Sequence, residues 1–331
     1  MVKKWLALAL KVAVSGALIW YLVGSIDLDA AKARLAQVDP AMLLVAAAML
    51  VIQMAIGGMR WRVVLKAIGE PLPFWRLVRL FYIGVFFNQA LPGGTGGDAV
   101  RIYMAYKADL GLRGAFNGVI LERIATVVTL VLMVLATQPF FLTKLDAAGR
   151  AWVVPSILMV SAGAAVGLVL LCLLDRLPAH LRQWRLVRGL GHLGGDARSV
   201  FLRPLPLLQA LIWSAAGHVN VALCVFVLAM GLGVEVSAFD CIVLMPPVLL
   251  VMTIPISIGA WGVRENAMVV AFGLVGVSAE AATVLGLLLG LVVLATAIPG
   301  GFLWFAQRQQ GAVSLSEAEA ELAAAGDAEK S

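Results

Sequence analysis

The sequence predicts an all-α, polytopic membrane protein, and three observations support this prediction. Of its 331 residues, 62% are hydrophobic and only 13% are charged, and the mean hydropathy is +0.98. A soluble domain carries about 25% charged residues. Several apolar runs also reach the length of about 20 residues that a membrane-spanning helix needs. Because the bilayer interior offers the backbone no hydrogen-bond partners, we expect these runs to be helical.

Six apolar segments have spanning length, and two more are shorter or interrupted. The spanning segments are Trp5–Gly24, Ala41–Met59, Gly118–Ala136, Trp152–Leu174, Leu207–Met230 and Ala281–Phe305. The first follows two lysines, as a signal peptide would, but it lacks a small-residue cleavage site. We therefore expect a retained helix there. The two interrupted segments are Phe81–Leu91 and Cys241–Ile258.

A short pattern occurs beside each interrupted segment. Both copies read Pro-x3-Gly-x3-Val-Arg, over Pro92–Arg101 and Pro255–Arg264. Segments interrupted by glycine and proline in corresponding places of two halves point to a binding site near the membrane midplane of a transporter-like fold. The sequence therefore predicts two broken or re-entrant segments related as an inverted repeat.

Basic residues in the loops predict how the chain crosses the membrane. Lysine and arginine mark cytoplasmic loops, which places the N-terminus inside. The stretches Arg60–Arg79 and Arg101–Arg113 are both basic, so the segment between them should enter and return rather than cross. By the same parity, Cys241–Ile258 enters from outside and returns through Asn266–Gly276. We expect a multi-pass protein of the inner (plasma) membrane with both termini in the cytoplasm.

The rest of the composition excludes several classes of protein. We expect a transmembrane domain over residues 1–308 and an acidic, disordered tail over residues 309–331. The net charge of +6 therefore understates the basic character of the membrane part. Basic membrane loops indicate topology rather than nucleic-acid binding. No Walker A, HExxH or GxSxG sequence occurs, and the three cysteines lack paired spacing, so we expect no cofactor, no metal and no enzyme activity.

The first copy of the pattern has the residue types of a phosphate site. Gly94, Gly96 and Gly97 let backbone N–H groups approach a ligand without a Cβ in the way. Asp98 can cap the helix that follows, and Arg101 lies one turn on. A glycine-rich turn before a helix, beside an arginine, suits a phosphate. A tight turn with a simple cap is the structural alternative.

Adjacent acidic and basic residues lie in both halves, as Glu122-Arg123 and Arg264-Glu265. A charge inside a membrane costs about 2.5–3.5 kcal/mol on insertion scales, so these residues are functional candidates. Because adjacent helical residues do not face each other, we expect partners across the fold. The expected pairs are Arg264 with Glu122 or Asp98, and Glu265 with Arg123 or Arg101. A purely structural ion-pair network is the alternative.

Three further polar positions have two readings each. Asn88 can offer its amide to a headgroup or make an interhelical hydrogen bond. His218 favours an interhelical contact over a proton relay. The stretches Arg60–Arg62 and Phe74–Arg79 combine aromatic rings with positive charge, which suits anionic headgroups at the inner surface or a plain positive-inside flank.

Four motifs carry a resemblance that spans roughly residues 5 to 308. They are Arg60-Trp61, Asn88…Leu91-Pro92-Gly93-Gly94-x-Gly96-Gly97-Asp98-x-x-Arg101, Glu122-Arg123 and Pro255…Gly259-x-x-Gly262-x-Arg264-Glu265. In combination they resemble the family of lysylphosphatidylglycerol synthase transmembrane regions, also called flippase-like membrane proteins. The resemblance implies a domain that moves or handles charged lipids, with its charged residues at one central polar site. The candidate lipid-binding residues are Asn88, Gly94, Gly96, Gly97, Asp98, Arg101, Glu122, Arg123, Gly259, Arg264 and Glu265.

Two departures from the family pattern limit what the resemblance implies. Bifunctional members carry a soluble aminoacyl-transferring domain after the membrane part, whereas about twenty acidic residues follow here. We therefore expect no aminoacylation of lipid by this chain. Ala260 stands where a second glycine is common, which weakens the expectation of backbone–phosphate contacts at the second copy.

The leading functional hypothesis is a lipid translocase for a charged or phosphate-bearing lipid. Arg101 and Arg264 would bind the phosphate, and the neighbouring carboxylates would hold these arginines. The alternatives are a secondary transporter of a small anionic solute and a non-transporting membrane partner of a lipid-modifying enzyme. The expected partners are membrane lipids of the anionic or polyprenyl-phosphate type, with such an enzyme or a second copy of the chain as further candidates.

Overall fold

The computed structural model describes residue 20 and residues 36–90, 96–108, 110–143, 145–176, 184–254, 257 and 259–309. Within these ranges every regular element is helical, which confirms the predicted all-α class. Five of these helices are long and apolar enough to cross a membrane, and they confirm five of the six predicted spans. The sixth, Trp5–Gly24, lies outside the described residues except for Trp20, as does the tail after residue 309.

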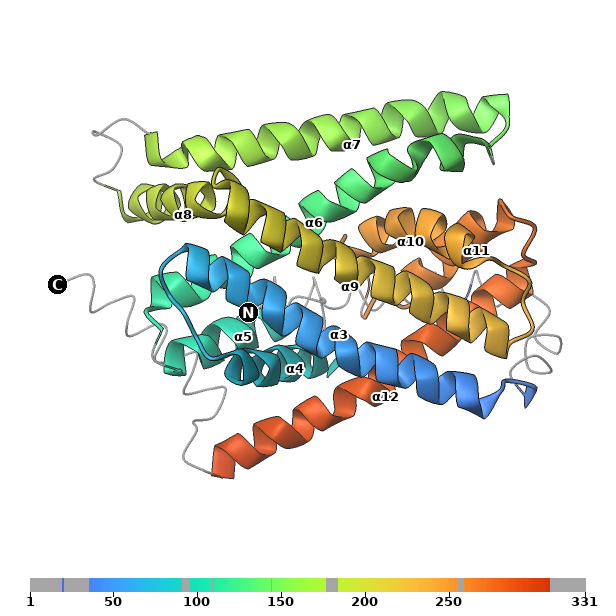
Figure 1. Ribbon diagram of the computed structural model, residues 1–331, viewed down its shortest axis with the longest axis horizontal. Helices are drawn as coiled ribbons and strands as arrows, with labels where there is room; N and C mark the ends of the chain where they lie inside the picture. The colour runs from blue at the N-terminus through green and yellow to red at the C-terminus, as the bar shows by residue number, and fades with distance from the viewer. Residues whose placement is uncertain are drawn as a thin grey trace.

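The described chain alternates long helices with short ones. The long helices are α3 (Pro40–Ala67), α6 (Leu112–Thr143), α7 (Ala147–Leu173), α9 (Pro204–Gly231) and α12 (Ala279–Gln309). The short elements are α4 (Phe74–Ala90), α5 (Gly96–Lys107), the 3-10 turn η1 (Leu174–Arg176), α8 (Arg185–Phe201), α10 (Ala238–Met252) and α11 (Val263–Gly273). All the long helices run roughly along the longest axis of the molecule (Figure 1).

The two interrupted segments form helical hairpins that stop inside the molecule. Helices α4 and α5 occupy the end shown at the left of Figure 1, whereas α10 and α11 occupy the opposite end. The re-entrant course expected from the basic loops stays a prediction, but each interrupted segment does pair with a short helix that follows it. The boundaries differ from the expected ones. Helix α4 begins at Phe74 rather than Phe81, and the return helix of the second hairpin begins at Val263 rather than Asn266.

Glycines let the first hairpin pack closely against its neighbours. A Cβ on Gly97 of α5 would overlap the carbonyl oxygen of Gly84 on α4. A Cβ on Gly300 of α12 would likewise overlap the carbonyl oxygen of Tyr82 on α4. Any larger residue at these places would push α4 away from α5 or α12. The close packing of α4 therefore requires glycine at both positions.

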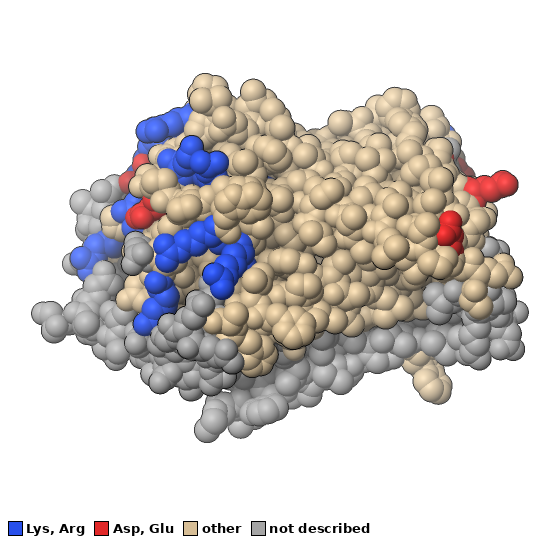
Figure 2. Space-filling model, turned by 60° about the horizontal axis from the view of Figure 1, so that its bottom comes forward, with Lys and Arg blue, Asp and Glu red and all other residues tan. Residues whose placement is uncertain are grey.

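Lysine and arginine side chains gather at one end of the molecule, where Figure 2 shows a few acidic residues among them, whereas acidic residues mark the opposite end of this face. The basic end carries Arg62, Lys66, Arg76, Arg79, Lys107, Arg113, Arg188, Arg198 and Arg203. The opposite end carries Asp39, Asp146, Glu235, Asp240 and Glu280, with Arg150. The positive-inside rule predicts such a separation across a membrane.

Helix α8 lies between the spans predicted at Trp152–Leu174 and Leu207–Met230 and was not among the predicted segments. Its Asp196 accepts hydrogen bonds from Arg113 at 2.8 Å and from Asn117 at 2.6 Å, both on α6. Its Arg198 donates to Asp175 of η1 at 2.8 Å. The apolar side of α8 joins a buried cluster with α3, α6 and α9. Polar ties and apolar packing together hold this helix at the basic end.

Candidate functional site

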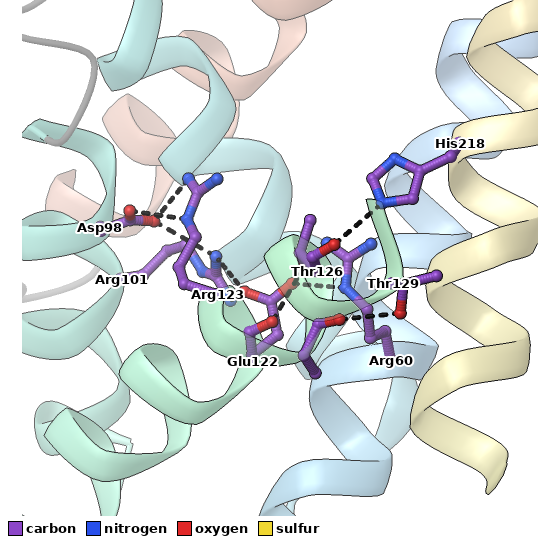
Figure 3. Close-up of polar contacts among 9 residues, drawn as sticks. Arg60, Asp98, Arg101, Glu122, Arg123, Thr126, Thr129 and His218 are labelled. Carbon is purple, nitrogen blue, oxygen red and sulfur yellow. Dashed lines mark hydrogen bonds and ion pairs between the residues drawn. The ribbon is translucent and has the colours of Figure 1, made fainter. Parts of the chain in front are cut away.

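Five charged residues from three helices meet inside the molecule, and we call them the charge cluster (Figure 3). They are Arg60 of α3, Asp98 and Arg101 of α5, and Glu122 and Arg123 of α6. At a rise of 1.5 Å per residue, Glu122 lies about 15 Å along α6 from its first residue. Helix α6 has 32 residues, so Glu122 lies about a third of the way along it. Charged groups inside a membrane protein require close pairing.

Glu122 is the centre of the cluster. Its side chain is fully buried, and its Oε1 atom accepts a hydrogen bond from Arg60 Nε at 2.6 Å and pairs with Arg60 Nη2. Its Oε2 atom accepts hydrogen bonds from both Nη1 and Nη2 of Arg101 at 3.1 Å. One carboxylate therefore fixes two buried guanidinium groups, as buried charges require.

Arg101 is held on its two faces as well as at its edge. Its guanidinium carbon lies 4.3 Å from the ring centre of Trp61 and 4.6 Å from that of Phe81. Stacking of this kind attracts a guanidinium group to the negative face of each ring. A Cβ on Gly84 would come within 2.5 Å of Arg101 Cγ, so the glycine makes room for the side chain. Arg101 is accordingly only 2% exposed.

The pair formed by Arg123 and Asp98 is the accessible part of the cluster. Arg123 Nε donates to Asp98 Oδ2 at 2.8 Å, and Arg123 Nη2 donates to Asp98 Oδ1 at 2.9 Å. Asp98 also accepts a longer hydrogen bond, of 3.3 Å, from Arg101. The Arg123 side chain is 43% exposed and that of Asp98 is 15% exposed. The other three members are nearly or fully buried, so this pair is the part of the cluster open to contact from outside.

The start of α5 differs from the expected one. Asp98 lies within the first turn of α5 and binds arginines, rather than standing before the helix as its cap. Asn88 of α4 instead accepts a hydrogen bond from the backbone N–H of Gly97 at 2.9 Å. This is the interhelical hydrogen bond expected as one alternative for Asn88. It occupies the Gly97 N–H, one of the backbone donors that the sequence analysis assigned to a phosphate.

Contacts beside the cluster confirm the expected role of His218. Its Nε2 atom lies 3.2 Å from the carbonyl oxygen of Thr126, one turn after Glu122 on α6 (Figure 3). The hydroxyl of Thr126 donates to the Glu122 carbonyl oxygen at 2.9 Å. His218 therefore links α9 to α6 behind the cluster, as an interhelical contact.

The second copy of the pattern forms a separate, neutral pair. Arg264 donates from Nε and Nη2 to Glu265 Oε1, at 3.0 and 2.5 Å. Glu265 Oε2 accepts a hydrogen bond from the Gly262 backbone N–H at 2.6 Å, and the Arg264 guanidinium lies 4.6 Å from the Trp261 ring centre. A Cβ on Gly290 of α12 would overlap that guanidinium. Both charged side chains are buried and satisfied within their own hairpin and α12.

The expected cross-fold pairs are therefore wrong. Arg264 pairs with neither Glu122 nor Asp98, and the partner of Glu265 is its own neighbour. The reason lies in helix position. Gly262 has a φ of 80° and is the N-cap residue of α11. Glu265 lies in the first turn, so its carboxylate reaches back to the Gly262 backbone N–H and pairs with Arg264 there. The rule that adjacent residues diverge applies to helix interiors and fails at this helix end.

Arg60 and Trp61 are also placed differently from the surface flank expected from the sequence. Arg60 is only 5% exposed and Trp61 is fully buried. Arg60 belongs to the charge cluster, and the Trp61 ring stacks on Arg101 of that cluster. The predicted span ended at Met59, whereas α3 continues to Ala67, so Arg60 lies about two turns inside the helix.

The structure brings part of the predicted site together. Gly94 lies outside the described residues, and Gly96 begins α5. Gly259 has φ of 57°, and a Cβ on it would lie 3.4 Å from Gln89 Oε1 at the end of α4. The inner ends of the two hairpins therefore face each other. Within the described ranges, no group of three His, Cys, Asp or Glu side chains lies close enough to hold a metal ion.

Comparison with known proteins identifies the family. A UPF0104 membrane protein of Pyrococcus horikoshii is 27% identical over 144 residues, which are 43% of this chain and 42% of the relative, so the match spans less than half of that protein. No solved structure matches the chain. A family model described as the lysylphosphatidylglycerol synthase transmembrane region matches residues 8–301, a range that includes both hairpins and the charge cluster. The chain therefore belongs to the family of lysylphosphatidylglycerol synthase transmembrane regions.

Proposed function

We propose that this membrane protein is a translocase for a charged or phosphate-bearing lipid, with the headgroup passing the charge cluster. The observation that carries the proposal is the charge balance of the cluster. Its three guanidinium groups face two carboxylates, so one positive charge is unbalanced among these five residues. An unbalanced charge inside a membrane protein is costly, and an anionic group beside it removes that cost.

Arg123 is the residue that we assign to the phosphate. It is 43% exposed, whereas Arg101 and Arg264 are 2% and 3% exposed and are bound to carboxylates. This assignment replaces the one made from the repeated pattern, in which the two pattern arginines bind the headgroup. The buried Arg60 and Arg101 add positive electrostatic potential at the headgroup, and Glu122 holds both guanidinium groups in place.

Asp98 is the residue that responds to the headgroup. It accepts hydrogen bonds from Arg123 at 2.8 and 2.9 Å and from Arg101 at 3.3 Å. A phosphate and a carboxylate compete for the same face of a guanidinium group. When the phosphate takes Arg123, Asp98 keeps a partner in Arg101, so the exchange leaves no carboxylate unpaired.

The two hairpins supply the gates in this proposal. They enter from opposite ends, and their inner ends face each other near Gln89 and Gly259 (Figure 1). Broken helices of this kind, related as inverted repeats, line midplane sites in secondary transporters and rock against each other. By the positive-inside rule, the basic end and both termini lie in the cytoplasm, and the membrane is the cell inner (plasma) membrane.

The test is lipid movement in reconstituted vesicles. Wild type, Arg123→Gln and the control Arg150→Gln, which lies at the opposite end, are each reconstituted with fluorescent phosphatidylglycerol or phosphatidylcholine. We expect Arg123→Gln to slow phosphatidylglycerol movement about tenfold or more, because a charge-assisted contact is lost. Arg150→Gln should match wild type. A folded Arg123→Gln variant that moves phosphatidylglycerol at the wild-type rate would refute the proposal.

The same charge balance also suits a small anionic solute. Uptake of a soluble anion down an ion gradient, with no lipid movement, would identify a secondary transporter. Activity of neither kind, together with co-purification of a lipid-modifying enzyme, would identify a membrane partner of that enzyme.

A further inference from the structure

A second basic site lies at the basic end and shares no residue with the charge cluster. It is a cavity of about 350 Å³ lined by Asp175, Gly195, Arg198, Ser199, Leu202 and Arg203. These residues come from η1, from α8 and from the junction between α8 and α9. We call this cavity the basic pocket. Ligand pockets have volumes from about 300 Å³ upward, so the basic pocket is large enough for a headgroup but not for a whole lipid.

The charge of the basic pocket favours an anion. Arg198 Nη1 donates to Asp175 Oδ2 at 2.8 Å, which balances these two groups. Arg203 is exposed, and its side chain makes no hydrogen bond or ion pair with the described residues. The pocket therefore holds one positive charge in excess, on a guanidinium group whose donors are all available.

An exposed aliphatic stripe leads away from the basic pocket. Leu202 at its rim is 64% exposed, and Leu205, Leu208 and Ile212 of α9 are 64%, 56% and 54% exposed. The last three repeat at helical spacing, so they lie on one side of α9. Helix α9 is one of the apolar, membrane-length helices, and its first residue lies at the basic end. A charged pocket above an aliphatic stripe matches the shape of a phospholipid, with its headgroup above its acyl chains.

We infer that the basic pocket binds the phosphodiester headgroup of an anionic phospholipid from the leaflet at the basic end. Arg203 and Arg198 contact the phosphate, and an acyl chain follows Leu205. Basic pockets between membrane helices are known to take such headgroups on the cytoplasmic side. This lipid is a bound component that joins η1 and α8 to α9, and it is not the lipid that passes the charge cluster.

The test is lipid binding to the purified, delipidated full chain, followed by native mass spectrometry. Phosphatidylglycerol and phosphatidylcholine are titrated separately into wild type, Arg203→Gln and Arg203→Glu. Arg188→Gln is the matched control, because it removes an exposed arginine of α8 that does not line the pocket. We expect phosphatidylglycerol to bind Arg203→Gln about fivefold more weakly than wild type, and Arg203→Glu more weakly still. Arg188→Gln should bind it as wild type does.

Two further arms separate this site from the charge cluster and from a soluble ligand. Native mass spectra resolve successive bound lipids, so Arg123→Gln should keep the phosphatidylglycerol molecule that Arg203→Glu loses, although its charge cluster binds lipid more weakly. Loss in Arg123→Gln with full binding in both Arg203 variants would overturn the inference and leave the proposed translocation site intact. Soluble glycerol phosphate at the same concentration should not displace the lipid. Displacement would mean that the pocket takes a free phosphate ester, which also overturns the inference. Because Arg203 is exposed, its variants should be as stable as wild type. Equal thermal unfolding midpoints will confirm that they fold.

Discussion

Arg101 donates two hydrogen bonds of 3.1 Å to a single oxygen of Glu122, and the other oxygen of Glu122 is taken by Arg60. This sharing sets the first copy of the repeated pattern apart from the second, where Arg264 has Glu265 to itself. Because Arg60 and Arg101 share one carboxylate, the cluster at the first copy has one positive charge in excess. The second copy has one carboxylate for its one arginine and is neutral. The functional asymmetry between the two halves follows from this difference in partners.

Replacing Glu122 with glutamine should destabilise the protein more than any other change in the charge cluster. Arg60 and Arg101 would remain buried without the carboxylate that both of them bind. Loss of one partner from a buried ion pair costs roughly 3–5 kcal/mol of the free energy of unfolding. Chemical unfolding in detergent measures this. Glu280→Gln, at the opposite end, is the control, and equal stability of the two variants would contradict the arrangement around Glu122.

The accessible pair should respond in opposite directions to its two single substitutions. Asp98→Asn frees Arg123 and raises the affinity for phosphatidylglycerol, whereas Arg123→Gln lowers it, each by about fivefold. A half-exposed ion pair contributes only about 1 kcal/mol or less to stability, so both variants should fold. Titration of vesicle-bound lipid measures both affinities. A decrease in both variants would show that Asp98 itself supports the headgroup.

Ala260→Gly should stabilise the second hairpin. Ala260 has φ of 60°, a left-handed conformation that costs a residue with a Cβ about 1–2 kcal/mol and costs glycine nothing comparable. Part of the gain is offset by the extra freedom of glycine in the unfolded chain. The thermal unfolding midpoint should therefore rise. Ala295→Gly, at an exposed position inside α12, should lower it, and the same sign in both variants would contradict the backbone assignment.

Gly84→Ala should displace Arg101 and impair both stability and transport. The new Cβ would lie within 2.5 Å of Arg101 Cγ and 3.1 Å of the Gly97 carbonyl oxygen. Overpacking of this kind costs about 1–3 kcal/mol. Gly163→Ala on α7 is the matched control, because a Cβ there has no neighbour within 4 Å. The control should unfold at or above the wild-type midpoint, since alanine favours a helix.

The sequence predicts the membrane-spanning helices well because hydropathy reports a property of the whole segment. It also predicts two interrupted segments, which the structure shows as pairs of short helices. Burial of individual charges is harder to predict. Arg60 and Lys66 both look like a basic flank of α3, yet only Arg60 is buried, because Glu122 from a distant segment meets it. Such pairing depends on how helices cross, and one sequence does not contain that geometry.

The neutral pair of the second hairpin could not be predicted for a different reason. The expectation that Glu265 faces away from Arg264 assumes a regular helix around both residues. The left-handed turn at Gly262 places Glu265 in the first turn, where its side chain turns back to the backbone. Helix α8 was not among the predicted segments, because its many arginines are typical of a loop. The hydrogen bonds that hold it, to Arg113 and Asp175, are made with other elements of the fold.

The unbalanced charge among Arg60, Arg101 and Arg123 also constrains the working cycle of the proposed translocase. A buried cation without a counterion is several kcal/mol less stable than a paired one. Each departing headgroup must therefore be replaced promptly by another anion, and turnover becomes counter-exchange rather than one-way passage. Small inorganic anions would act as competing counterions, and the exchange rate would depend on the anions present on both sides of the membrane.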